Sequence, residues 1–241
     1  MTQLKTILNL NSVDVPALVC SKEIGNSVII NLHGLDVSKE VNIIDMDRLE
    51  EAGFWSVTID APHHGERDDG YLDIMRNANK REAYFMFLSI IQQEATEVTD
   101  LVKFYKSQGK KVAVYGISMG AYATYSLMMI NREADLFAPF MGNPDFRAKG
   151  NFIYSLPEIS GPIDNCDKIF PANMFIVNAG SDDVVDPEGA RRFYKAIKPY
   201  YKDNPEKLEY LEYPESGHLM RPNDWFDAWD ALIARLKREG F

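Results

Sequence analysis

Hydrophobic and polar positions follow two different rhythms along this chain of 241 residues. Near the N-terminus they alternate with a period of two, which predicts the strands Lys5–Leu10 and Val15–Cys20 around a turn at Asn11–Asp14. After Gly25, short and nearly continuous apolar runs are typical of strands buried on both faces. Pro139 disfavours one of these runs, because proline lacks the N–H that a sheet requires. The runs lie at Val28–Leu32, Trp55–Ile59, Lys111–Tyr115, Leu136–Phe140, Asn173–Asn178 and Lys207–Tyr213.

Between these runs, apolar residues recur every three or four positions, which predicts helices with one buried face. The longest of these patterns extends from Tyr84 to Tyr105 and ends at Gly109, and we expect its aromatic side chains to face the core. Shorter helices are predicted between Val41 and Gly53, over Ala121–Ile130, over Pro187–Lys198 with Asp186 as N-cap, and after Asn223. Strands that alternate with helices predict a parallel sheet covered on both faces.

Composition and charge narrow the classes of function. The hydrophobic fraction is 46%, and 36 acidic residues against 26 basic ones give a net charge of −10. A single α/β domain over residues 1–241 fits this length, and the negative charge argues against a nucleic-acid partner because phosphates are repelled. Two cysteines, Cys20 and Cys166, form neither a disulfide framework nor a zinc motif. Without an apolar run of roughly 18 residues or a signal sequence, we expect a cytoplasmic protein with no membrane partner, and the oligomeric state is not indicated.

One short motif carries chemistry. Gly116–Ile117–Ser118–Met119–Gly120 follows a predicted strand and opens a predicted helix. On such a sharp turn a serine hydroxyl projects outward, and glycines are needed on both sides because the backbone is crowded there. A merely structural tight turn is the alternative, but the strand and helix on either side favour Ser118 as a nucleophile.

With this arrangement the chain resembles the α/β-hydrolases over essentially its whole length. The resemblance implies an α/β-hydrolase fold: a mostly parallel central sheet flanked by helices, here with an N-terminal antiparallel hairpin and a small cap insertion. The segment Asp60–Arg67 reads D-A-P-H-H-G-E-R, which is similar to esterases and peptidases related to prolyl oligopeptidase. We expect no propeller domain like that of those peptidases within these 241 residues.

The resemblance also implies a catalytic acid and a catalytic base, in the chain order nucleophile, acid, histidine. The family's acid typically comes three residues after a glycine that follows a late strand, which selects Asp183 after Gly180. We interpret Asp182 as a possible cap of the turn. His218 is expected to be the base, because the other three histidines precede Ser118. The histidine would take the serine proton, and the carboxylate would hold the ring in its useful tautomer.

By the same resemblance, the backbone amides of Leu35 and Met119 are the expected oxyanion-hole donors. His33 ends the preceding strand, and we interpret it as a structural support for this loop. His63 and His64 lie near several acidic residues, which raises a metal site as an alternative. Adjacent histidines cannot share one face of an element, and no HExxH spacing is present. We therefore expect no metal and interpret the loop as a structural element beside the active site.

These residues predict a serine hydrolase that cleaves a small to medium carboxylic ester through an acyl-enzyme intermediate, with a small-molecule partner and no cofactor. A peptidase, amidase or thioesterase with the same triad remains an alternative, as does a catalytically idle protein that binds a ligand or partner. Residues 141–170 are rich in proline, glycine and aromatic residues, and a connection this long predicts a lid. We expect Phe146, Phe152 and Tyr154 in it to shape the acyl pocket.

Overall fold

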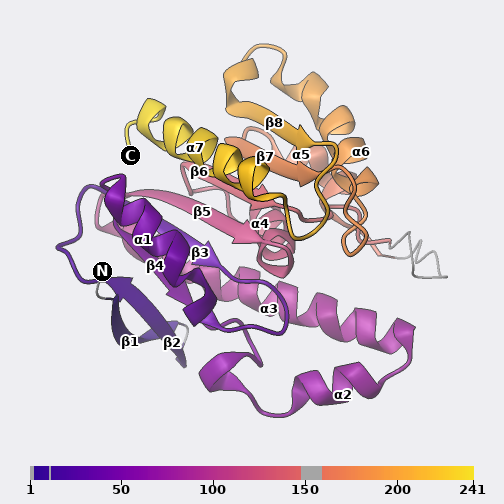
Figure 1. The fold of residues 1–241 in the computed structure, drawn as a ribbon, viewed down its shortest axis with the longest axis horizontal. Helices are drawn as coiled ribbons and strands as arrows, with labels where there is room; N and C mark the ends of the chain where they lie inside the picture. The colour runs from indigo at the N-terminus through magenta and orange to yellow at the C-terminus, as the bar shows by residue number, and fades with distance from the viewer. Residues whose placement is uncertain (1–2, 11, 148–158) are drawn as a thin grey trace.

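The structure is a computed structural model that describes residues 3–10, 12–147 and 159–241. A twisted eight-stranded sheet runs through the molecule in the order β1-β2-β4-β3-β5-β6-β7-β8 (Figure 1). The first two strands are antiparallel to their neighbours and the other six are parallel, which confirms the predicted hairpin and parallel sheet. The strands are β1 (Gln3–Leu10), β2 (Val13–Cys20), β3 (Ser27–Leu32), β4 (Ser56–Ile59), β5 (Lys111–Ile117), β6 (Leu136–Phe140), β7 (Met174–Ala179) and β8 (Leu208–Tyr213).

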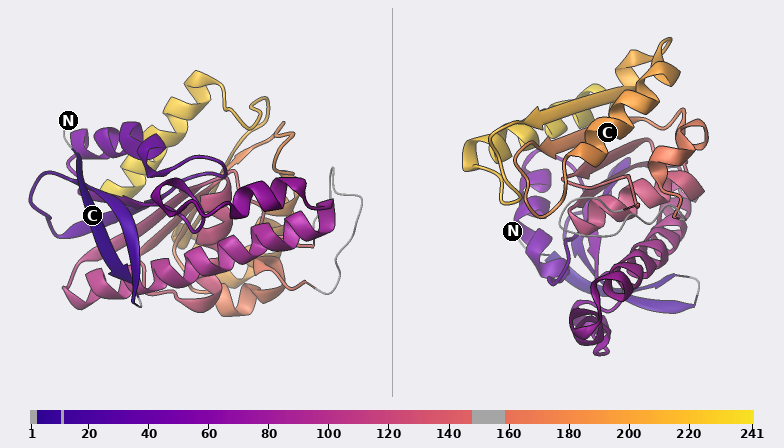
Figure 2. Two further views of the ribbon diagram at one scale, coloured as in Figure 1. Left: turned by 90° about the horizontal axis from the view of Figure 1, so that it is seen from below. Right: turned by 90° about the vertical axis from the view of Figure 1, so that its right-hand side faces the viewer.

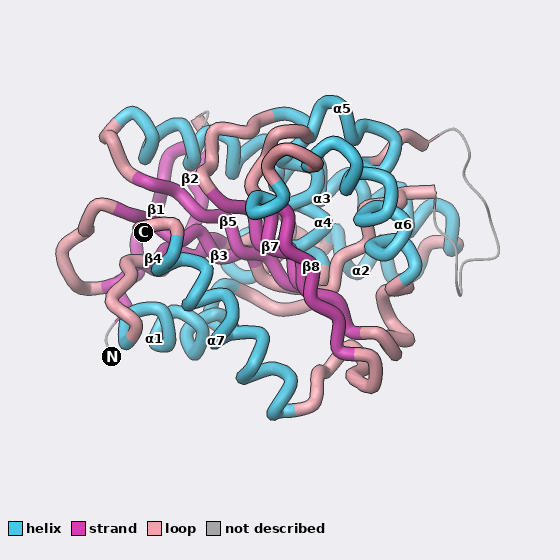
Figure 3. Tube along the Cα trace, turned by 90° about the horizontal axis from the view of Figure 1, so that it is seen from above, coloured by secondary structure: helices cyan, strands magenta, loops and turns pink. Residues whose placement is uncertain are grey.

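Helices cover both faces of the sheet, as Figures 2 and 3 show. Alternate residues of the central strands face opposite ways: Val112 and Val114 pack toward α3 and α4, whereas Ala113 and Tyr115 pack toward α1 and α7. The core is therefore split into two layers by the sheet. The helices are α1 (Ile43–Glu51), α2 (Tyr71–Asn77), α3 (Lys80–Ser107), α4 (Met119–Ile130), α5 (Cys166–Ile169), α6 (Glu188–Ile197) and α7 (Pro222–Arg238).

Two strands differ from the sequence expectation. β2 begins at Val13, which pairs with Leu10, so the connection after β1 is shorter than the predicted turn at Asn11–Asp14. β6 forms at the predicted residues in spite of Pro139 and lies inside the sheet. It pairs with β7 only at Phe137 and Phe140, so the ladder is interrupted at the residue that has no N–H to donate.

The long helix α3 has different surroundings at its two ends. From Ile90 to Tyr105 its apolar stripe packs into the main core, as predicted. Tyr84 lies outside that core, in a small cluster with Phe87. This first part of α3 and the antiparallel α2 form a corner that projects past the sheet (Figure 1). Among the described helices, none has the length and apolar character that a membrane crossing requires.

Candidate active site

Ser118 stands at the turn between β5 and α4, with a left-handed φ of 53°. The two glycines around it are required by contact with backbone atoms. A Cβ on Gly116 would lie 2.2 Å from the carbonyl oxygen of Gly120, and a Cβ on Gly120 would lie 2.4 Å from that of Leu32. The unusual φ of a non-glycine residue is thus maintained by close packing on both sides, which exposes the hydroxyl at the C-terminal edge of the sheet.

His218 and Asp182 complete a chain of hydrogen bonds from the serine. Ser118 Oγ lies 3.1 Å from His218 Nε2, and His218 Nδ1 lies 2.7 Å from Asp182 Oδ2. His218 follows β8, and Asp182 follows β7, so both side chains come from loops at the same edge of the sheet as Ser118. With Nδ1–H donated to Asp182, Nε2 is free to accept the serine proton, which is the arrangement that activates a serine nucleophile.

The residue paired with His218 corrects the sequence expectation of Asp183. Asp183 is exposed and makes no hydrogen bond or ion pair with the rest of the described chain, whereas Asp182 is buried. The turn decides between these neighbours. Asp182 Oδ1 accepts the N–H groups of Val184 and Val185, each at 2.8 Å, and this clamp aims Oδ2 at the imidazole. Asp186 has a separate role, since its carboxylate accepts the N–H of Glu188 at the start of α6.

The two backbone amides that are expected to donate to an oxyanion belong to Leu35, which follows β3, and Met119, which follows β5. The end of β3 is tied to the serine turn because Gly120 N–H donates to the carbonyl of His33 at 3.0 Å. A Cβ on Gly34 would lie 3.7 Å from the Ser118 Cβ, so this part of the chain passes close to the serine. Within the described chain, the amides of Leu35 and Met119 have no hydrogen-bond acceptor. Two unused N–H groups next to a serine are a suitable environment for a developing negative charge.

His33 supports this loop from behind. Its Nδ1 lies 2.7 Å from the carbonyl oxygen of Gly34, and its Nε2 accepts the N–H of Ala61 at 3.0 Å, so Nδ1 carries the proton. Burial lowers the pKa of His33 to about 4. The ring is therefore neutral near pH 7 and joins the end of β3 to the loop after β4, in agreement with its interpretation as a structural residue.

The loop after β4 is held by two ion pairs. Asp60 is fully buried and accepts from the backbone N–H and the Nζ of Lys39, the latter at 2.7 Å. Arg67 makes a bidentate pair with Glu97 of α3, with both distances 2.7 Å. These contacts hold the loop against the segment after β3 and against α3. They agree with the interpretation of this loop as a structural element.

The two adjacent histidines of the same loop point to different partners. His63 Nδ1 lies 2.9 Å from an oxygen of Asp69, and the His63 ring stacks on Tyr71 with 4.0 Å between the ring centres. His64 Nδ1 lies 2.8 Å from the carbonyl oxygen of Pro62. Each ring is therefore engaged with its own surroundings, and the two do not converge on one point.

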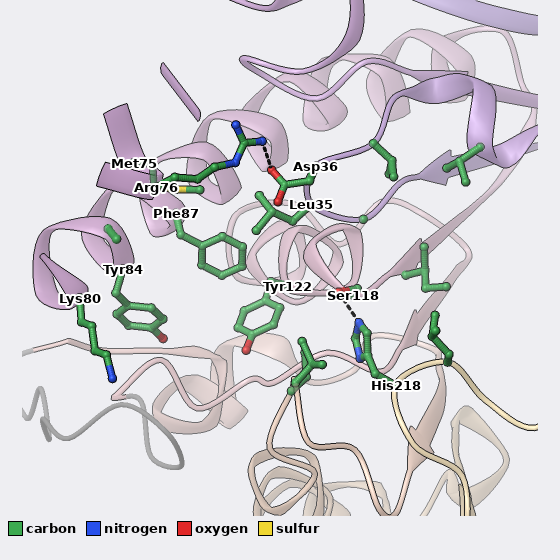
Figure 4. Close-up of a pocket in the computed structure, with 18 of the residues that line it drawn as sticks. Leu35, Asp36, Met75, Arg76, Lys80, Tyr84, Phe87, Ser118, Tyr122 and His218 are labelled. Carbon is green, nitrogen blue, oxygen red and sulfur yellow. Dashed lines mark hydrogen bonds and ion pairs between the residues drawn. The ribbon is translucent and has the colours of Figure 1, made fainter. Parts of the chain in front are cut away.

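A cavity of about 750 Å³ opens beside Ser118 (Figure 4). Aliphatic and aromatic side chains provide most of its wall. One side is formed by the α2–α3 corner, with Met75, Tyr84 and Phe87, and the other includes Val37, Val41 and Leu219 near the mouth. Leu219 is 94% exposed although it directly follows His218, so the mouth of the cavity has an apolar rim. A volume of this size suits a small or medium ligand with apolar groups.

The segment 141–170, where a lid is expected, is described only in part. Phe152 and Tyr154 lie outside the described residues. The described parts of this segment contribute no side chain to the cavity surface. Phe146 is buried behind the wall, where it stacks on Tyr122, and its carbonyl oxygen accepts the Tyr84 hydroxyl at 2.9 Å. The sequence pattern missed the α2–α3 corner because a stripe of aromatic residues looks the same whether it faces a core or a cavity.

No family model matches the chain. A curated relative from Bacillus subtilis (strain 168), named "Putative esterase YitV", is 23% identical over 233 residues, which covers 84% of this chain and 89% of the relative.

Two solved structures show the same fold at low sequence identity. TT1662 from Thermus thermophilus superposes with a TM-score of 0.75 at 19% identity and covers 99% of this chain and 98% of its own. A puromycin-hydrolyzing peptidase from Mycobacterium tuberculosis superposes with a TM-score of 0.72 at 16% identity, over 99% of this chain and 39% of the peptidase. Together with the sheet order and the serine turn between β5 and α4, these likenesses show that the chain has an α/β-hydrolase fold.

Proposed function

We propose that this protein is a serine hydrolase that cleaves small to medium carboxylic esters through an acyl-enzyme intermediate. The observation that carries the proposal is the chain of hydrogen bonds from Ser118 through His218 to Asp182, at the wall of an apolar cavity. A curated relative named as an esterase supports the same class of substrate.

The proposed reaction uses Ser118, His218, Asp182 and two backbone amides. His218 Nε2 removes the proton from Ser118 Oγ as Oγ bonds to the ester carbonyl carbon, and the N–H groups of Leu35 and Met119 stabilise the oxyanion. When the tetrahedral intermediate collapses, the C–O bond to the alcohol breaks and His218 returns the proton to the departing oxygen. Water then attacks the acyl-serine by the same steps. Asp182 holds Nδ1–H and stabilises the imidazolium that forms in each half.

Labelling and a substrate panel test this proposal. A fluorophosphonate probe should react with Ser118, and Ser118→Ala should abolish both labelling and ester hydrolysis while the fold remains, because the side chain lies at a turn tip. Ser89→Ala is the matched control, since Ser89 is an exposed serine on α3 away from the cavity, and it should keep both. Labelling of another serine, or hydrolysis by Ser118→Ala, would reject Ser118 as the nucleophile.

The substrate panel separates esters from the alternatives. We expect turnover of p-nitrophenyl esters to depend on acyl length, because the cavity has a limited volume. Amide and thioester analogues of the same acyl groups belong in the same panel, since the triad alone can serve all three bond types. Faster cleavage of the amides than of the esters would assign the protein to the peptidases instead. An intact triad with no turnover of any analogue would favour a binding role.

A further inference from the structure

Tyr122 presents a hydroxyl group to the cavity that the proposed reaction leaves unused. It lies on α4 one turn after Ser118, and its backbone N–H donates to the Ser118 carbonyl at 3.1 Å. Residues four apart share a face of a helix, so both side chains reach the same cavity. In the view of Figure 4, the Tyr122 ring lies between Tyr84 and the Ser118–His218 pair.

Its ring is held firmly. The ring meets Phe87 edge to face with 5.2 Å between centres, and it stacks on Phe146 with 5.9 Å between centres. Only 8% of the Tyr122 surface is exposed. Aromatic contacts on two sides leave the ring little freedom, so the position of its hydroxyl is preset before any ligand binds.

The hydroxyl has no partner in the described protein. Within the part of the chain that the structure describes, no hydrogen bond to the Tyr122 hydroxyl is formed, whereas the nearby Tyr84 hydroxyl donates to a backbone carbonyl. The hydroxyl of Tyr125 is also unpaired but is enclosed by protein atoms, and the Tyr122 hydroxyl is not. Burial raises the pKa of Tyr122, with smaller contributions from Tyr84 and Asp182, so the group stays protonated and can donate.

The other polar groups of the cavity wall already have partners or lie at its rim. Arg76 is paired with both Asp36 and Asp73, each at 2.6 Å. Lys80 lines the cavity but its side chain is exposed to solvent. A ligand that fills the cavity takes water away from the Tyr122 hydroxyl, so a ligand oxygen that accepts from this donor avoids the cost of leaving it unpaired. Tyr122 is therefore the place where an otherwise apolar wall can recognise a polar feature of the substrate.

We propose that Tyr122 is a specificity-determining residue that donates a hydrogen bond to an oxygen in the substrate, separate from the scissile ester, so that the preferred substrates are apolar esters with an additional ether, carbonyl or hydroxyl oxygen. This inference rests on the proposed ester hydrolase function and adds a substrate class to it. A site built to bond one polar atom discriminates against analogues that lack the atom, because the donor is then left unpaired.

Matched esters can test the pairing. The substrates are p-nitrophenyl esters of one chain length, with an all-carbon acyl chain or with one methylene replaced by an ether oxygen at successive positions. We expect wild type to prefer one ether position over the hydrocarbon chain in kcat/KM by about tenfold. Tyr122→Phe should remove that preference. Tyr84→Phe is the matched control, because it deletes a hydroxyl at the same cavity that is already bonded to the protein, and it should keep the ratio.

The outcomes separate this inference from the proposed function. If wild type has no preferred ether position, or if Tyr122→Phe lowers the hydrocarbon and ether esters by the same factor, Tyr122 does not read a substrate oxygen although ester hydrolysis stands. If both Tyr122→Phe and Tyr84→Phe lose the preference for the ether ester, the preference comes from the shape of the cavity and not from a hydrogen bond to Tyr122. If wild type hydrolyses none of these esters and Ser118 resists the fluorophosphonate, the proposed function itself fails.

Discussion

At the scale of single residues, a position in the site can be predicted from the sequence where steric contacts allow only one type of residue. Gly116 and Gly120 admit no side chain, so the serine between them could be recognised from the motif alone. Neighbouring aspartates are different. Both Asp182 and Asp183 are reasonable in the sequence, and the choice depends on which one accepts the backbone N–H groups of its own turn. This hydrogen bonding is a property of the folded loop. The spacing from Gly180 predicts Asp183, whereas the structure pairs Asp182 with His218.

The pairing of Asp182 with His218 leads to a direct prediction. Asp182→Asn should lower kcat by roughly 10³–10⁴-fold, because an amide no longer holds His218 in the tautomer that accepts the serine proton. Asp183→Asn is a matched control on the adjacent exposed carboxylate and should change kcat less than about twofold. Steady-state kinetics on one p-nitrophenyl ester are sufficient. A larger loss in Asp183→Asn than in Asp182→Asn would restore the sequence expectation.

At the scale of elements, the strands and helices were predictable because burial imposes a period on each of them. α3 shows the limit of this reasoning. Its stripe continues without a break from Tyr84 to Tyr105, yet Tyr84 belongs to a separate small cluster, whereas the buried residues from Ile90 onward belong to the main core. Periodicity identifies the face that avoids water but not what that face meets. The cavity wall at the α2–α3 corner could therefore not be distinguished from core in the sequence.

The same helix contains a buried carboxyl group, Glu94, whose burial makes the free energy of unfolding depend on pH. Glu94 is fully buried, and neither of its oxygens has a partner in the described chain. Burial, together with the neighbouring Glu97, raises its pKa to about 8. An unfolded chain ionises this group near its ordinary pKa of about 4.3, so the native state binds more protons between those values and loses stability as pH rises through that window.

Glu94→Gln should remove this dependence, because the amide does not ionise. We expect the free energy of unfolding of wild type to fall by several kcal/mol more than that of the variant between about pH 5 and pH 8. Urea denaturation at a series of pH values measures this difference. Glu82→Gln, at an exposed position of the first turn of α3, is the control and should follow wild type. Parallel curves for Glu94→Gln and wild type would show that Glu94 is ionised in the native state.

At the scale of the whole molecule, the fold class was the most predictable feature, since it follows from the order of many elements and survives an error in any one of them. Net charge acts at this scale too. The chain has a formal charge of −10. Arg76, a cation in the cavity wall, is already paired with Asp36 and Asp73. Lys80 adds one positive charge at the cavity, which opposes the negative field of the whole protein.

The field predicts how salt changes substrate choice. At low ionic strength, kcat/KM for an ester with a terminal carboxylate should be several-fold below that of a neutral ester of equal length, because the negative protein repels the anion as it approaches. Screening shortens the Debye length from about 30 Å at 0.01 M to about 3 Å at 1 M, so salt should raise kcat/KM for the anionic ester and leave the neutral one nearly constant. If salt instead lowers kcat/KM for the anionic ester, and Lys80→Met abolishes that decrease, attraction by Lys80 at the rim outweighs the net charge. Lys103→Met, an exposed lysine farther along α3, is the matched control for the loss of one positive charge.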